Sequence, residues 1–228
     1  MHQFVVVSMK SDRFKPGCID QNTGSENLGE MSSELALASM YGTLHRQFGL
    51  SKASWQQFLP EMAVVHTAPK CQLQEAGQLV TQFYFLVEGL VRFYYVTPDG
   101  KESNKAFYAE NNIVGSLSAL ILNEPCRFTV ETMEPCTLVA LPYDPKGDIW
   151  QSSTEWQYVF NRCCQLMLVR NERREAELLT LSAKQRYLQF VQNFPNYIER
   201  IPQYHIASYL GVTPVALSKY KNQWLSEV

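Results

Sequence analysis

The chain has 228 residues, of which 46% are hydrophobic and 18% charged, a composition that suits one large globular domain or two modest ones. The net charge of −2 and the pI near 6.1 supply no global attraction to nucleic acid, so any such function must rest on a local patch. Six scattered cysteines without a signal peptide indicate reduced thiols in the cytoplasm. No apolar run approaches the roughly 18 residues of a membrane span, so no membrane is expected as a partner.

The residue pattern of the amino-terminal part of the chain changes twice. Residues 1–30 show little periodicity and are rich in Gly, Ser, Asn and Asp, so we interpret them as a mobile extension. A helical pattern covers 33–48, and Ser51 is placed to cap a short second helix. Over 64–141, short apolar and aromatic runs alternate with turn residues such as those at 97–100, which predicts an antiparallel β-roll or sandwich.

A long helical stretch without Gly or Pro follows, from about Ser153 to Leu181. Its apolar residues cover more than one face, so we expect it to pack on its own domain and against the same helix of a second subunit. The alternative is a helix wholly buried within one chain. The predicted dimer interface is the stripe at steps of four, three and four residues, formed by Trp156, Phe160, Cys163 and Met167. The vicinal pair Cys163 and Cys164 suits packing better than a redox trigger.

The segment 201–220 contains the parts of a helix-turn-helix. Gly211 supplies the left-handed residue that ends the first helix, and Thr213 caps the second helix, with Pro214 in its first turn. Residues 180–228 carry five Lys or Arg against two Glu, a local charge of +3. A plain helical hairpin is the alternative to a recognition unit. The residues predicted to contact DNA are Thr213, Val215, Ser218, Lys219 and Lys221.

The order of these parts resembles the Crp/Fnr family of bacterial transcription regulators. The stretches that carry the resemblance are 86–92, 99–102, the long helix, 183–187 and 206–213. The resemblance implies an α+β fold with an N-terminal antiparallel β-roll (a jelly-roll, cyclic-nucleotide-binding-like), a long dimerisation helix and a C-terminal helix-turn-helix domain. We assign these to 31–152 with flanking helices, 153–181 and 182–228.

Two departures from the family pattern concern DNA recognition. Pro214 and Val215 stand early in the recognition helix, where such regulators commonly place an Arg or Glu, so we expect a different operator. Only a few residues follow the recognition helix before Val228, so contacts from a C-terminal β-hairpin wing are not expected.

The expected function is a transcription regulator, not an enzyme, that binds a palindromic site on double-stranded DNA as a homodimer. RNA polymerase and a small-molecule effector are further candidate partners. The alternative is a cyclic-nucleotide- or small-molecule-binding regulatory module that acts on a protein partner without DNA. No cofactor or metal is expected, because the four histidines form no H-x-H pair for a cupin-type iron site and the cysteines form no C-x-x-C pair.

The effector pocket departs further from the family. In family members that bind cyclic AMP, the phosphate-binding cassette resembles Gly-Glu-Leu followed later by Arg-Ser or Arg-Thr. There the Glu holds the ribose, and the Arg together with the hydroxyl holds the cyclic phosphate. Ser116 is too short to replace that Glu, and Phe128 removes the hydroxyl, so we predict no cyclic AMP binding in the usual way. Arg127 then grips another anion or pairs with Glu131 or Glu124. The matching residues are Gly115, Ser116, Leu117, Ser118, Arg127, Phe128 and Thr129.

Overall fold

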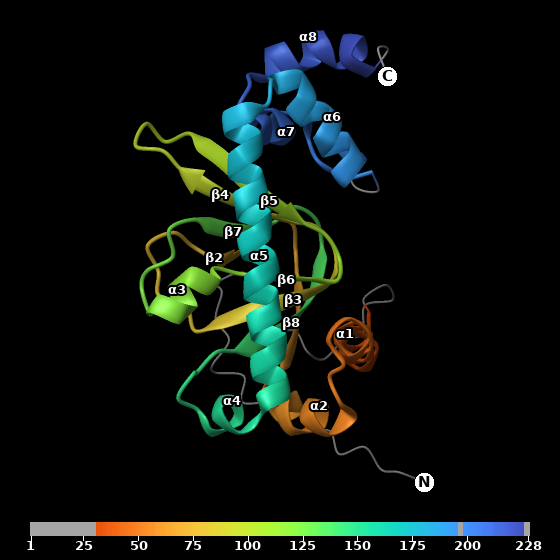
Figure 1. Ribbon diagram of the computed structural model, residues 1–228, viewed down its shortest axis with the longest axis vertical. Coiled ribbons are helices and arrows are strands. Elements are labelled where there is room, and N and C mark those ends of the chain that lie inside the picture. Colours follow the sequence, from red (N-terminus) through yellow and green to blue (C-terminus); the bar gives the residue numbers. More distant parts are fainter. Residues whose placement is uncertain (1–30, 196–197, 226–228) are drawn as a thin grey trace. The chain divides into compact units, whose positions relative to one another are not determined.

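The computed structural model describes residues 31–195 and 198–225, and the predicted extension over 1–30 lies outside them (Figure 1). The chain divides into two compact units. The first holds the described residues up to Val91 together with Tyr108–Cys163, and the second holds Arg92–Phe107 and the residues from Cys164 onward. This division differs from the predicted domains, because a segment assigned to the β-roll domain groups with the C-terminal helices.

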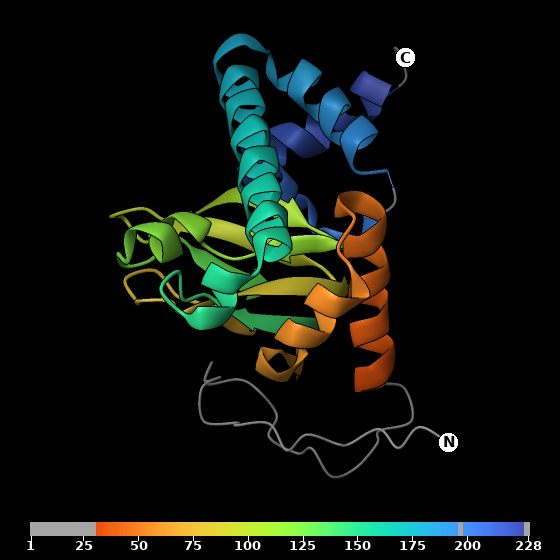
Figure 2. The same cartoon turned by 60° about the horizontal axis from the view of Figure 1, so that its bottom comes forward.

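Two capped helices open the first unit. Helix α1 (Ser33–Phe48) follows Ser32, whose hydroxyl accepts the Leu35 N–H at 3.3 Å. Helix α2 (Lys52–Phe58) is capped by Ser51 as predicted, and a 3-10 turn at Leu59–Glu61 follows it. Helix α1 packs against strands of this unit, and Figure 2 shows it running beside them.

The strands of the first unit are antiparallel. Strands β1 (Ala63–Thr67), β8 (Cys136–Pro142), β3 (Gln82–Glu88) and β6 (Asn112–Val114) form one sheet in that order, with Phe85 opposite Val139 in the β3–β8 register. Strands β2 (Gln72–Gln74) and β7 (Thr129–Thr132) form a second antiparallel pair. Short helices α3 (Leu117–Leu122) and α4 (Asp148–Ser152) complete the unit. The predicted antiparallel roll is therefore present.

The long helix α5 (Thr154–Thr180) begins in the core of the first unit. Trp156 is only 1% exposed, its ring lies against Phe58, and its indole N–H donates to the Ser54 carbonyl at 2.9 Å. The Phe160 ring stacks on Tyr143 at 4.6 Å, and Cys163 is also buried. Helix α5 is thus fixed at its start by side chains that all lie within its own unit.

This packing corrects the predicted dimer interface. Trp156, Phe160 and Cys163 are covered by their own unit and present no surface to a second subunit, and Met167 is half-buried. The apolar spacing was identified correctly, but periodicity reveals only that a helix face is buried and not which surface covers it.

The second unit joins a hairpin to the C-terminal helices. Strands β4 (Val91–Val96) and β5 (Glu102–Tyr108) pair across the predicted turn, where the Gly100 N–H donates to the Thr97 carbonyl at 2.8 Å. Helix α6 (Ala183–Asn193) opens with a capping box formed by Ser182 and Gln185. A 3-10 turn (Ile198–Arg200), α7 (Gln203–Leu210) and α8 (Pro214–Leu225) follow (Figure 1). The Tyr209 ring lies 5.4 Å from the rings of both Phe107 and Phe190, which joins hairpin, α6 and α7 in one core.

The cysteines depart in part from the expectation of reduced thiols. Cys126, Cys136, Cys163 and Cys164 are free, whereas Cys71 is disulfide-bonded, so the expectation is wrong for Cys71. Burial raises the pKa of the Cys164 thiol, which disfavours the reactive thiolate and supports packing over a redox trigger. Across 31–195 and 198–225, no helix combines the length and apolarity needed to cross a membrane.

Candidate functional sites

The turn between α7 and α8 is formed by the residues that the sequence predicts for it. Gly211 ends α7 in the left-handed region at φ +69°, and the Val212 N–H donates back to the Ala207 carbonyl at 3.0 Å. The Thr213 hydroxyl accepts the Ala216 N–H at 3.1 Å and so caps α8 as predicted. Pro202 is the residue before α7.

The two helices pack through a cluster of apolar side chains. Ile206, Ala207 and Leu210 of α7 and Leu217 of α8 are buried, and Val212 between them is half-buried. The absence of a large side chain at Ala207 lets the backbones approach closely.

The opposite face of α8 lies in solvent. Val215 is 78% exposed, and Thr213, Ser218 and Lys219 are also exposed, whereas Lys221 is half-buried. The structure therefore leaves four of the five predicted DNA contacts on one open surface. Their contact with DNA stays a prediction.

Arg186, one of the five basic residues counted in 180–228, makes hydrogen bonds to the backbone. The Arg186 Nε donates to the Leu210 carbonyl at 3.0 Å, and one of its terminal nitrogens donates to the Leu181 carbonyl at 2.6 Å. Both acceptors lie at helix ends, where carbonyls lack intrahelical partners and a positive charge is favourable. Arg186 thus fixes the approach to the helix-turn-helix, a role that the sequence count of charges did not reveal.

The β4–β5 hairpin is hydrogen-bonded to α7. The Asn104 backbone N–H donates to the Ser208 hydroxyl at 3.0 Å, and the Asn104 side-chain amide donates to the His205 carbonyl at 3.0 Å. The same amide and the Arg92 guanidinium lie 3.1 and 3.3 Å from His205 Nδ1. Two donors around one nitrogen require that nitrogen to be unprotonated.

The environment of His205 opposes its charged form. Burial, followed by the positive charge of Arg92, lowers its pKa from 6.5 to about 4, while Glu102 acts in the opposite direction. Glu102 also pairs with Arg92 at 2.5 Å. From the sequence, we consider the histidines only as candidate metal ligands. No local pattern indicates that a hairpin far upstream in the chain contacts His205.

The cassette that would hold a cyclic phosphate is closed by the chain itself. The Ser116 backbone N–H donates to the Gln74 side chain at 2.7 Å, and the Gln74 amide donates to the Gln82 carbonyl at 2.7 Å. Ser116 is 1% exposed, and its hydroxyl has no hydrogen-bond partner among the residues that the structure describes. Gly115 and Leu117 beside it are buried, whereas Ser118 is exposed.

The residues of the second cassette segment do not fit the phosphate either. The Arg127 side chain is 82% exposed and lies 3.7 Å from Glu124, one of the two carboxylates expected as its partner. Phe128 is buried, and the Thr129 hydroxyl accepts a hydrogen bond from the Ala76 N–H at 3.2 Å. Ser116 supplies no carboxylate and Phe128 no hydroxyl, so two of the groups that the resemblance implies around a cyclic phosphate are replaced by residues of other chemistry.

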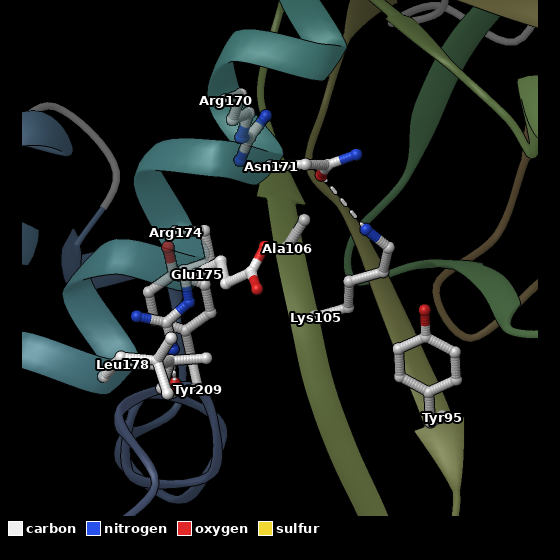
Figure 3. A pocket seen from close by; sticks show the side chains of 10 residues that line it. Tyr95, Lys105, Ala106, Arg170, Asn171, Arg174, Glu175, Leu178 and Tyr209 are labelled. Atoms are coloured by element: carbon white, nitrogen blue, oxygen red, sulfur yellow. Dashed lines mark hydrogen bonds between the residues drawn. The ribbon is translucent and has the colours of Figure 1, made fainter.

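A separate pocket of about 320 Å³ lies within the second unit (Figure 3). The Lys105 ammonium donates to the Asn171 side-chain oxygen at 3.2 Å, and burial together with the nearby charge of Arg170 lowers the Lys105 pKa. Arg174 lies over the Tyr209 ring at 3.8 Å. The lining residues are Tyr95, Lys105, Ala106, Arg170, Asn171, Arg174, Glu175, Leu178, Leu179 and Tyr209. Sequence reasoning missed this pocket, because its walls come from three separate segments.

Comparison with known protein families gives a match over the β-roll. Residues 64–152 match the family model of the cyclic nucleotide-binding domain. No curated protein sequence matches the chain.

Solved structures share the wider fold. CLP of Xanthomonas campestris, a c-di-GMP-responsive global regulator, is 13% identical with a TM-score of 0.65 over 78% of this chain and 93% of CLP. FixK2 of Bradyrhizobium japonicum is 16% identical with a TM-score of 0.63 over 73% and 85%. A cyclic-nucleotide-binding-type protein of Ruegeria pomeroyi DSS-3 is 17% identical with a TM-score of 0.55 over 86% and 89%. The predicted fold class and the resemblance to Crp/Fnr-type regulators are confirmed at the level of the fold.

Proposed function

We propose that the protein is a transcription regulator that binds double-stranded DNA sequence-specifically as a two-fold dimer. The observation that carries this proposal is the α7–α8 pair, with Gly211 and Thr213 forming the turn and Val215, Ser218 and Lys219 on the open face of α8. A helix presented in this way suits insertion into a major groove, where side chains reach the base edges. The fold shared with solved regulators supports the same conclusion.

Selection of binding sites from random DNA tests this proposal directly. We expect a palindromic site for the wild-type chain, and Lys219→Ala to weaken specific binding by about 1 to 3 kcal/mol and to change the preferred bases. Lys146→Ala is the matched control, because this exposed lysine lies in a loop of the first unit. Enrichment of no site would contradict DNA recognition and favour a regulatory module that acts on a protein partner.

The dimer that we propose uses the exposed side of α5. At 100° per residue, positions spaced four and three residues apart share one side, opposite the buried Trp156 and Phe160. On that side Tyr158, Val169 and Leu179 are exposed apolar residues, with polar or charged residues between them. The spacing of four and three residues along that side is the spacing of the seam between paired helices. The exposed positions of the seam are Tyr158, Arg162, Gln165, Val169, Glu172, Ala176 and Leu179.

A pair of valine variants separates this interface from a general effect of added charge. Val169→Glu places a carboxylate in the seam and should yield a monomer, whereas Val96→Glu alters a valine of similar exposure, 54% against 42%, on the hairpin. Light scattering at micromolar concentration measures both. A wild-type monomer, or a Val169→Glu dimer as stable as the control, would refute the seam without affecting the DNA-binding surface.

A further inference from the structure

The pocket of the second unit gathers positive charge from two elements. Lys105 comes from β5, and Arg170 and Arg174 come from α5, against the single carboxylate of Glu175 among the lining residues. The charge of Arg170 is one of the causes that lower the Lys105 pKa, so the two cations repel each other across a partly desolvated site. A bound anion would relieve that repulsion.

Apart from Asn171, the remaining lining is aromatic or aliphatic. Tyr95, Leu178 and Leu179 are exposed hydrophobic side chains, and most of the open surface of the pocket is carbon. Figure 3 shows Lys105 extending between Tyr95 and Asn171, with Leu178 on the α5 side of the pocket. A site that combines cationic side chains with apolar walls, in a volume near the lower limit of roughly 300 Å³, suits a small ligand with one acidic group.

We propose that this pocket binds a small aryl carboxylate, with Lys105 and the Asn171 amide holding the carboxylate and Tyr95 and Leu178 covering the ring. This inference goes beyond the proposed function. If the protein is a regulator, such a ligand would be its effector, in place of the cyclic nucleotide that the β-roll cassette does not fit.

The hydrogen bonds of the two arginines favour a carboxylate over a phosphate. Arg170 donates to the Phe107 carbonyl at 2.6 Å, and Arg174 donates to the Tyr209 carbonyl and pairs with Glu177 at 3.4 Å. Tight phosphate sites use arginine forks for bidentate contacts. Here both forks support the backbone of the hairpin and of α7, which leaves a single lysine as a point charge.

The pocket also adjoins the helix-turn-helix. Tyr209 belongs to α7, Lys105 to the hairpin and Asn171 to α5, and all three lie in the second unit. A ligand that contacts all three would stabilise the arrangement in which the hairpin holds α7. Binding would therefore act on the helix that precedes the recognition helix.

Calorimetric titration of the full chain with benzoate, benzamide and inorganic phosphate tests the proposal. We expect saturable binding of benzoate and at least tenfold weaker binding of benzamide, which has the same shape without the charge. Phosphate should bind more weakly than benzoate. An absence of saturable benzoate binding at tens of millimolar, equal binding of benzamide, or tighter binding of phosphate would each overturn the proposal.

Two variants with matched controls place the ligand. Lys105→Met should weaken benzoate binding about tenfold or more, whereas Lys101→Met removes an exposed lysine of the same hairpin and should have no effect. Asn171→Asp puts a carboxylate beside Lys105 and should also abolish binding, whereas Asn161→Asp, at another exposed position of α5, should not.

Asn171→Asp changes an exposed side chain, so it serves if Lys105→Met fails to fold. Unchanged affinity in a folded variant at either pocket position would refute the site. These titrations contain no DNA, so failure to find an operator leaves their outcome intact.

Discussion

Acidification should loosen the contact between the β4–β5 hairpin and α7 through His205. Its ring is buried, accepts from Asn104 and lies beside Arg92, and its pKa is lowered to about 4 from 6.5. Because the folded state disfavours the proton, the stabilising contribution is complete above pH 6.5 and is lost as the pH falls through 6.5 toward about 4. Protonation would replace an acceptor by a donor that faces Arg92 and the Asn104 amide.

The size of the effect follows from the depressed pKa. At about 1.4 kcal/mol for each pH unit, the free energy of unfolding should fall by about 2 kcal/mol near pH 5 and by up to about 3 kcal/mol near pH 4. Burial of His205 is the larger cause and the charge of Arg92 the smaller, with Glu102 offsetting part of the shift.

The matched variant is His205→Asn, whose side-chain oxygen reaches the region of the imidazole Nδ1 and accepts from Asn104 without titrating. Urea unfolding followed by far-ultraviolet circular dichroism, near pH 7.5 and near pH 5 at one protein concentration, should show a larger acid loss in the wild type. Titration of the histidine ring protons by NMR measures the pKa itself. A His205 pKa near 6.5, or equal acid losses in the two proteins, would refute the reasoning.

Three further predictions concern two glycines, Phe160 and two cysteines. Gly89→Ala should lower the free energy of unfolding by roughly 3 kcal/mol or more, because the new Cβ would lie 2.5 Å from Cys136 Sγ at φ +110°. Gly100→Ala, at φ +80° with no described atom within 4 Å, should lower it by about 1 kcal/mol. Urea unfolding compares the two variants. Phe160→Ala should destabilise the first unit by about 3 to 5 kcal/mol and leave the subunit count in light scattering unchanged. In a pulse of iodoacetamide at neutral pH, half-buried Cys164 should be alkylated before Cys136, whose buried thiol has its pKa raised to about 12, and mass spectrometry identifies the order.

Local chemistry made several elements predictable from the sequence. The caps at Ser51 and Ser182, the hairpin turn at 97–100 and the α7–α8 turn at Gly211 and Thr213 all depend on residues within a few positions of one another. In each case a short polar side chain or a residue free to adopt positive φ is needed by the backbone itself. The antiparallel roll followed from the same kind of signal, repeated along the chain.

The tertiary structure decided what covers each surface. Periodicity found the apolar stripe of α5 but assigned it to a second subunit, whereas Trp156 and Phe160 are covered by aromatic rings of their own unit. The hairpin contact of His205 and the pocket around Lys105 join segments separated by tens to about a hundred residues. A sequence determines which face of an element avoids water, but the partner of that face depends on long-range packing, which no local pattern records.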